Sequence, residues 1–365
     1  MNNIFQLLTL FVLFQLFFIS FFLFISNKGR KTSNFLLAFF FLSLASGLLD
    51  YYFLISGYYD GNTQYALVLN SLVIFHAPLL LLYTQSLTTK KFHLKLIHLL
   101  HVLPFIIAFT LLIIFYYNQS PERQKFVLED VKKGKELSTI LISVFGFIYE
   151  LTYLVVIKIK IRNYREEIVE HFSNLDKINL NWLNFLVNVF IISVLASTFS
   201  NVLRHSQIIQ MDQGAIVIGL IGLLFFIVSV LLKGLHQNEI FLGAGQSLVE
   251  GKYSSKENDD MLQKLKYHLK NEKPYLNPDL TLNELAAQLQ VSSRQLSTLI
   301  NSELGKSFFD LINSYRIEEA KNILQESKDS KLTVLEVMYQ VGFNSKSSFN
   351  TAFKKYTGKT PSSFK

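Results

Sequence analysis

The chain of 365 residues contains no cysteine. A disulfide framework, a zinc site with thiolate ligands, an iron–sulfur cluster and a thiol nucleophile are therefore all excluded. Charged residues are scarce as well, at 17% of the chain against about 25% in a typical soluble domain. Metal ligands would have to come from the eight histidines and the carboxylates, and we expect neither a metal site nor a cofactor.

Sequence motifs of catalysis are also missing. The chain has no H-E-x-x-H motif and no G-x-S-x-G motif. The stretch from Gly245 to Lys252 does not fit a phosphate-binding loop, because its spacing is one residue too long and Tyr253 stands where Ser or Thr is required. The sequence therefore predicts that the protein is not an enzyme.

Apolar residues, in contrast, are abundant. They make up 50% of the chain, which holds 34 Phe and 17 Tyr and has a mean hydropathy of +0.30. Before residue 235 they form stretches of about 20 residues, the helical length that crosses a bilayer core. A backbone in hydrocarbon must satisfy its own hydrogen bonds, so each stretch is expected to be helical. The sequence predicts a seven-span transmembrane bundle in residues 1–233, with spans at 4–26, 35–56, 65–86, 96–117, 138–157, 182–203 and 213–232.

Basic residues predict the orientation of these spans. The connections after spans one, three and five hold eleven Lys and Arg residues, and the alternate connections hold six. Cytoplasmic connections carry the excess of positive charge, so we expect the N-terminus outside and the C-terminus in the cytoplasm. The expected location is the inner membrane of a bacterium, with the lipid bilayer as one partner.

Ionisable side chains inside the expected spans are candidates for function, because placing them in a bilayer is costly. Asp50, His76 and Glu150 lie in spans two, three and five and form a candidate pocket for a small molecule or an envelope signal. The alternative is that each one pairs with a neighbouring helix or reaches the interface. The charged connection at 158–181 is expected to be a solvated loop.

A polar tail follows the last expected span. Residues 234–258 contain four glycines without sustained periodicity and are expected to be a linker. Residues 259–365 show helical periodicity, with capping signals at Thr281 and Ser292. They predict two helix-turn-helix units, about 281–303 and 333–356, joined by a helix at 307–326. The expected fold class is thus all-α, a membrane bundle followed by a cytoplasmic domain.

The tail resembles a known family at many positions of fixed spacing. The segment from Leu282 to Leu324 is similar to the first half of an AraC/XylS-type DNA-binding domain. The segment VGFNSKSSFNTAFKKYTGKTPSSFK closely resembles the second half of that domain, notably at Gly342-Phe343 and Thr360-Pro361. The resemblance covers roughly the last hundred residues and implies binding to double-stranded DNA. No cupin-like barrel precedes it, so a sugar ligand is not implied.

A helix-turn-helix unit places its second helix in the major groove of DNA. Together with the resemblance, this assigns base-facing and phosphate-facing positions to exposed residues of the two second helices. The net charge of residues 274–365 is only +2, from eleven basic and nine acidic residues, so we expect two copies on repeated half-sites, as in a homodimer. The base-facing candidates are Arg294, Ser297, Thr298, Lys346, Ser347 and Thr351, and the phosphate candidates are Asn301, Asn350, Lys354 and Lys355.

These patterns favour a membrane-bound, one-component transcription regulator that receives a signal in its membrane part and reads DNA with its tail. One alternative is a transporter or channel-like protein whose DNA-binding tail regulates its own expression. Another is that the linker is cut and the tail is released to reach DNA. A third is that the tail binds protein instead of DNA, which the basic second unit disfavours.

Overall fold

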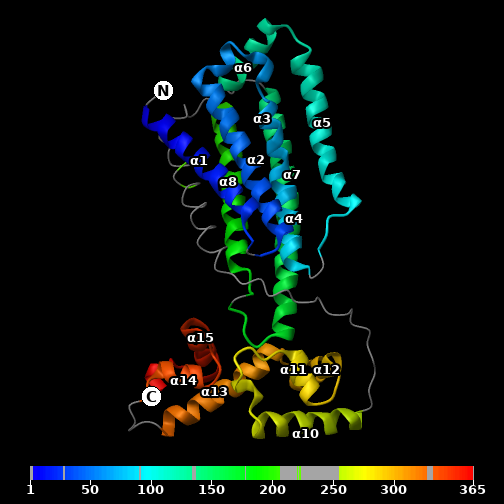
Figure 1. Ribbon diagram of the computed structural model, residues 1–365, viewed down its shortest axis with the longest axis vertical. Helices are drawn as coiled ribbons and strands as arrows, with labels where there is room; N and C mark the ends of the chain where they lie inside the picture. Colours follow the sequence, from blue (N-terminus) through cyan, green and yellow to red (C-terminus); the bar gives the residue numbers. More distant parts are fainter. Residues whose placement is uncertain are drawn as a thin grey trace. The chain divides into compact units, whose positions relative to one another are not determined.

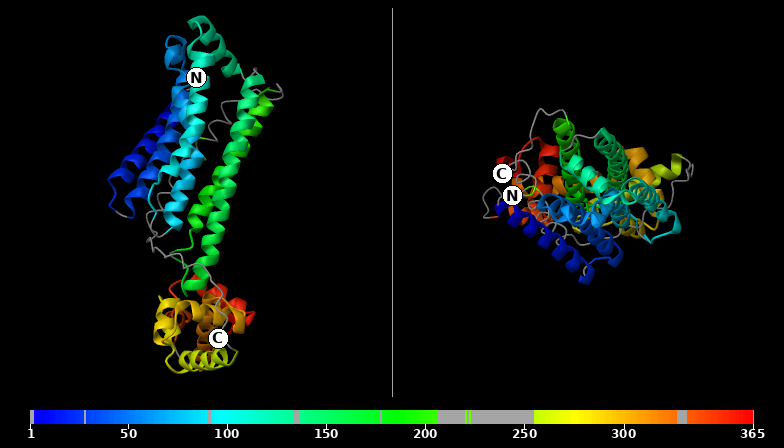
Figure 2. Two further views of the ribbon diagram at one scale, coloured as in Figure 1. Left: turned by 90° about the vertical axis from the view of Figure 1, so that its right-hand side faces the viewer. Right: turned by 90° about the horizontal axis from the view of Figure 1, so that it is seen from above.

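The computed structural model describes residues 3–27, 29–89, 92–133, 137–176, 178–205, 220, 222, 255–326 and 332–364. Every regular element in these ranges is a helix, and the strand-like pairing among them is a single bridge between Phe172 and Thr281. The expected all-α class is confirmed (Figures 1 and 2). By its contacts the chain divides into two compact units, residues 1–161 with 180–243 and residues 162–179 with 244–365.

The first unit is built around α1 (Asn3–Ile25) and α2 (Lys31–Ser56), which pack along each other. Large apolar side chains such as Phe40 and Phe41 are fully buried in α2. The helix ends at Gly57, whose φ of 80° is a left-handed conformation that glycine adopts without steric cost.

The third apolar stretch is broken rather than continuous. Pro78 has no backbone N–H, so the carbonyl of Ile74 cannot receive the usual helical hydrogen bond from it. The hydroxyl of Tyr149 donates to that carbonyl instead, at 3.2 Å. The stretch is divided into the short elements η2 (Thr63–Tyr65), α3 (Val68–Ser71), η3 (Leu72–Phe75) and α4 (His76–Thr88).

The connection at 118–137 holds an ordered helix, α6 (Pro121–Lys133). Its Gln124 is buried and accepts a hydrogen bond of 2.7 Å from the hydroxyl of Thr63. Leu128 packs in an apolar cluster with Tyr59 and Tyr116. This small cap closes one end of the unit beside η1 (Tyr58–Asp60) and η5 (Ile113–Tyr117). The elements η4 (Leu96–Val102) and α5 (Leu103–Leu112) precede η5 in the fourth apolar stretch.

Four helical stretches of the described residues are long and apolar enough to cross a membrane: Gln6–Ile25, Lys31–Ser56, Thr63–Thr88 and Leu96–Tyr117. They coincide with the first four expected spans. The fifth expected span lies within α7 (Leu137–His171), and the sixth within α8 (Asn181–His205), whose apolar part Asn181–Ala196 is shorter. The seventh, at 213–232, and the linker up to residue 254 lie outside the described residues, apart from Leu220 and Gly222. Four spans are thus supported, and the count of seven stays a prediction.

The second unit contains two apolar cores that share one helix. Leu285, Leu296 and Phe308 belong to the first core, and Ile317 and Phe349 belong to the second. The shared helix is α13, which supplies its first half to one core and its second half to the other. The elements in order are α10 (Ser255–Asn271), η6 (Pro274–Leu276), α11 (Leu282–Gln288), α12 (Ser293–Leu304), α13 (Phe308–Glu326), α14 (Val334–Gln340), α15 (Lys346–Thr357) and α16 (Pro361–Phe364).

Residues 162–179 belong by their contacts to this second unit. Helix α7 continues to His171, and Ser173 behind it is 2% exposed. The backbone N–H of Ser173 donates to the carbonyl of Leu280, just before α11. The expectation of a solvated loop at 158–181 is therefore wrong, because the segment is partly helical and its far end is bound to the tail.

Candidate nucleic-acid interface

The first helix pair, α11 and α12, is positioned by two capping boxes. The hydroxyl of Thr281 accepts from the backbone N–H of Glu284, whose carboxylate accepts from the N–H of Thr281. Ser292 and Gln295 repeat this exchange at the start of α12. Each box satisfies two N–H groups that the first helical turn leaves without a partner, so the two helices begin where the sequence predicts.

The second pair, α14 and α15, is positioned in the same way. Thr333 and Glu336 form a capping box, and the hydroxyl of Ser345 accepts from the N–H of Ser348 at 3.2 Å. Phe349 and Phe353 are buried on the inner face of α15. The opposite face of α15 is consequently turned away from the core and is available to a partner.

Gly342 makes the turn between α14 and α15. Its φ is +88°, and a Cβ atom there would lie 2.8 Å from the backbone oxygens of both Tyr275 and Leu276. The turn therefore needs glycine for its conformation and for the close approach of η6. This contact ties the second helix pair to the segment that precedes the first pair.

Arg316, in the middle of α13, is the largest of the fully buried side chains, with 1% exposure. Its Nε donates to the carbonyl of Tyr275 at 2.7 Å, and Nη2 donates to the carbonyl of Asn277 at 2.8 Å. Its Nη1 and Nη2 also donate to the carbonyl and hydroxyl oxygens of Ser173, both at 3.1 Å. Burial lowers the pKa of Arg316 to about 10, and the charge of Asp279 opposes this shift. The guanidinium thus stays charged at neutral pH and joins three segments.

The candidate DNA-contacting residues fall on α12 and α15, the second helix of each pair. Arg294 and Ser297 are half-buried, and the remaining candidates are exposed. Their roles in contacting DNA stay predictions. On α12 they are Arg294, Ser297, Thr298 and Asn301, and on α15 they are Lys346, Ser347, Asn350, Thr351, Lys354 and Lys355.

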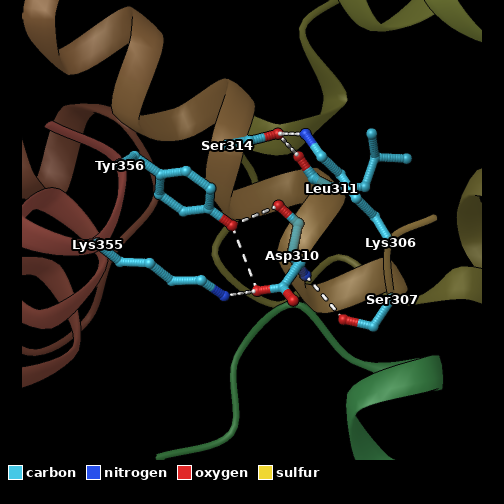
Figure 3. Close-up of polar contacts among 7 residues, drawn as sticks. All are labelled: Lys306, Ser307, Asp310, Leu311, Ser314, Lys355 and Tyr356. Atoms are coloured by element: carbon cyan, nitrogen blue, oxygen red, sulfur yellow. Dashed lines mark hydrogen bonds and ion pairs between the residues drawn. The ribbon is translucent and has the colours of Figure 1, made fainter. Parts of the chain in front are cut away.

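Lys355, one of the phosphate candidates on α15, has a partner within the domain (Figure 3). Its Nζ lies 2.6 Å from the Asp310 carboxylate, at the start of α13. The hydroxyl of Tyr356 donates to the carbonyl of Asp310 at 2.9 Å. Burial raises the pKa of Tyr356, and the charge of Asp310 adds to the shift. Lys355 therefore links α15 to α13, and a phosphate contact from it competes with this link.

Arg316 was missed by reasoning from the sequence, although one signal pointed to it. It lies four residues after Ile312 and four before Ala320, both of them buried, so a charged side chain stands on the apolar face of a helix. Its contact with Ser173 spans 143 positions of the chain. No local pattern predicts a contact of that separation.

The three candidate pocket residues of the first unit do not all meet. His76 and Glu150 lie 3.9 Å apart, measured from Nδ1 to Oε1, and both are largely buried. Asp50 is buried too, and its carboxylate accepts a hydrogen bond of 2.9 Å from the hydroxyl of Tyr59. The structure thus supports a His76–Glu150 pair and places Asp50 with the cap at the end of α2. Nε2 of His76 has no hydrogen-bond partner among the described residues.

Comparison with known proteins bears on the C-terminal part. Residues 285–365 match a family model described as a helix-turn-helix domain. A chain titled the C-terminal domain of AraT, a response regulator from Geobacillus stearothermophilus, is 34% identical, and the similarity covers 28% of this chain and 81% of that one. The TM-score of that pair is 0.25, too low to argue a shared fold.

Curated proteins give further matches. An uncharacterized HTH-type transcriptional regulator of Staphylococcus aureus (strain COL) is 25% identical over 173 residues, which are 47% of this chain and 20% of that protein. One from Pseudoalteromonas carrageenovora is 33% identical over 108 residues, 30% of this chain and 60% of that protein. The chain thus spans about a fifth of the length of the first of these relatives. It ends in an AraC-type helix-turn-helix domain.

Proposed function

We propose that the protein is a membrane-bound, DNA-binding transcription regulator of a bacterium, without a separate partner to carry its signal. The observation that carries the proposal is the pair of capped helix-turn-helix units in the segment that matches the family model. The names of the similar proteins, HTH-type transcriptional regulators, support the same function.

The geometry supports DNA binding through α12 and α15. The first residues of a recognition helix contact base edges in the major groove. In this chain those residues are Arg294 on α12 and Lys346 on α15. Either side chain can donate to the O6 and N7 atoms of guanine, a contact that contributes about 1–3 kcal/mol of discrimination between bases.

A location in the membrane is supported by the surface of the first unit. Four apolar stretches are long enough to cross a bilayer, and almost none of Leu96–Tyr117 is buried within the protein. Large apolar side chains such as Phe14 and Phe21 are more than 60% exposed. Contiguous apolar surface of this size needs an apolar surrounding, and lipid supplies one. We place the protein in the inner membrane, with its tail on the cytoplasmic side.

Signal input belongs to the membrane part in this proposal. His76 lies on α4 and Glu150 lies on α7, and the two side chains form a buried pair. A change in the packing of these two helices therefore alters the interaction between the imidazole and the carboxylate. A small molecule or envelope signal acts only if it binds two packings of the helices with different affinity. Two copies of the protein bind repeated half-sites, because one tail carries little net positive charge.

Chromatin immunoprecipitation of the full-length protein in its native membrane tests the proposal. The variant Arg294→Ala/Lys346→Ala removes one base-facing candidate from each recognition helix. A matched control, Lys266→Ala/Lys270→Ala, removes the same charge from exposed positions of α10.

Discrete genomic peaks that persist in the control and vanish in the Arg294/Lys346 variant support a sequence-reading regulator. Equal loss in both variants indicates binding by net charge alone. Peaks that are unchanged in both variants contradict the assignment of α12 and α15 as the reading helices.

A further inference from the structure

Both recognition helices contact acidic residues of the segment 162–179. The side-chain amide of Asn301, on α12, donates a hydrogen bond of 3.1 Å to the Glu170 carboxylate. The hydroxyl of Ser348, on α15, donates to the Asp176 carboxylate. One short segment thus binds one residue from each helix-turn-helix unit.

A buried anchor lies between these two carboxylates. The hydroxyl of Ser173 donates to the carbonyl of Leu280 at 2.7 Å and accepts from Nη2 of Arg316 at 3.1 Å. Phe172 forms a bridge with Thr281, the capping residue of α11. The segment is therefore held in a defined register, and its carboxylates are directed to the recognition helices.

One carboxylate binds a candidate DNA-contacting residue, and the other binds the neighbour of one. Asn301 is a candidate for phosphate contact, and Ser348 adjoins the base-facing candidate Ser347. DNA carries one negative charge for about every 1.7 Å of its axis. A carboxylate at each recognition helix competes for the hydrogen-bond donor and repels the approaching phosphates.

We propose that residues 162–179 form a latch that competes with DNA for the recognition helices, an inference that rests on the proposed function. The latch is joined to the membrane part by covalent structure. Helix α7 runs without interruption from Leu137 to His171, so Glu150 and Glu170 lie on one helix. A signal that shifts or rotates α7 therefore changes the fit of the latch, and DNA binding in turn favours the shifted helix.

Cross-linking of the full chain in lipid nanodiscs tests the contact. The natural chain has no cysteine, so introduced thiols are the sole targets of a bis-maleimide with a reducible spacer. We expect the pairs Glu170→Cys/Asn301→Cys and Asp176→Cys/Ser348→Cys to form an intramolecular cross-link, while each single-cysteine variant forms none. Failure of both pairs to cross-link overturns the latch.

DNA binding of the Asp176→Cys/Ser348→Cys protein, in which no candidate DNA-contacting residue is replaced, tests the competition. The probe is a mixed-sequence duplex of about 40 base pairs, long enough for two half-sites separated by a helical turn. We expect cross-linked protein to lose binding and to regain it when the spacer is reduced. Cross-linked protein that binds as well as reduced protein contradicts the competition.

Substitution of the carboxylates supplies a second measurement without cross-links. We expect Glu170→Gln/Asp176→Asn to bind the duplex about fivefold more tightly or better, the lower end of measured couplings. The DNA affinity of the single variant Glu170→Gln is compared with that of Glu166→Gln, the control. Glu166→Gln removes the same charge one helical turn away, at a residue that pairs with Arg162.

Equal affinity of Glu170→Gln and Glu166→Gln overturns the latch but leaves DNA binding intact. If no variant binds the duplex, whether its spacer is reduced or its carboxylates are replaced, the proposed function and the latch are overturned together. The two failures are thus distinguishable.

Discussion

The turn at Gly342 yields a prediction whose size follows from the structure. In the variant Gly342→Ala, the backbone of the alanine must adopt a φ of +88°, which costs about 1–2 kcal/mol for a residue other than glycine. Its Cβ also meets two backbone oxygens, of Tyr275 and Leu276, at 2.8 Å. Crowding of this kind costs a further ~1–3 kcal/mol. We therefore expect a total loss of about 2–5 kcal/mol in the stability of the second helix pair.

Gly358 supplies the matched control, because it follows α15 with a similar φ of +73° but has open space around its added Cβ. Gly358→Ala should cost about 1–2 kcal/mol, from the backbone alone. The difference between the variants, about 1–3 kcal/mol, corresponds to roughly 5- to 150-fold in an equilibrium constant.

Hydrogen exchange of the backbone amides in α14 and α15 measures this difference on the full-length protein, because exchange reports the free energy of local opening. We expect faster exchange in Gly342→Ala than in Gly358→Ala. Equal exchange in the two variants refutes the argument that the contact with η6, rather than φ alone, requires glycine at the turn.

Three further predictions concern the same unit. The pKa of Tyr356 is raised in the folded state, so its contribution to the free energy of unfolding is present below pH ~10 and is lost as the pH rises above that value. Tyr356→Phe should therefore weaken the fall in stability at high pH, which unfolding measured as a function of pH detects. Lys354→Ala should reduce the slope of DNA affinity against salt by about one. Lys355→Ala should reduce that slope less, because Lys355 is held by Asp310, and a salt titration compares the two. Ser173→Ala should speed exchange at the amides of 172–176 by the loss of buried hydrogen bonds that contribute about 1–3 kcal/mol.

The helix-turn-helix units could be predicted closely because their signals are local. A capping box involves residues three positions apart, and Thr281 with Glu284 forms the expected box in the structure. The apolar spacing of Leu282, Leu285 and Ala286 likewise matches their burial. Hydrophobic periodicity and caps act within one or two helical turns, so they can be recognised before any tertiary contact is known.

The first unit was predicted less completely. Four apolar stretches were confirmed as helical and long enough to cross a membrane, since length and hydropathy are properties of the sequence. The break before His76 was not predicted. A proline removes a backbone N–H donor wherever it occurs. The hydrogen bond that the Ile74 carbonyl accepts from the Tyr149 hydroxyl, however, depends on a helix 75 positions away.

Helix content, caps and apolar stretches follow from the sequence, because the forces behind them act between near neighbours. The buried place of Arg316 and the docking of residues 162–179 on the recognition helices were decided by the tertiary structure alone. A guanidinium in an apolar core must find acceptors for its N–H groups, and the fold brings Ser173 to it across 143 positions. Satisfying a buried charge thus selects a partner that no spacing in the chain reveals.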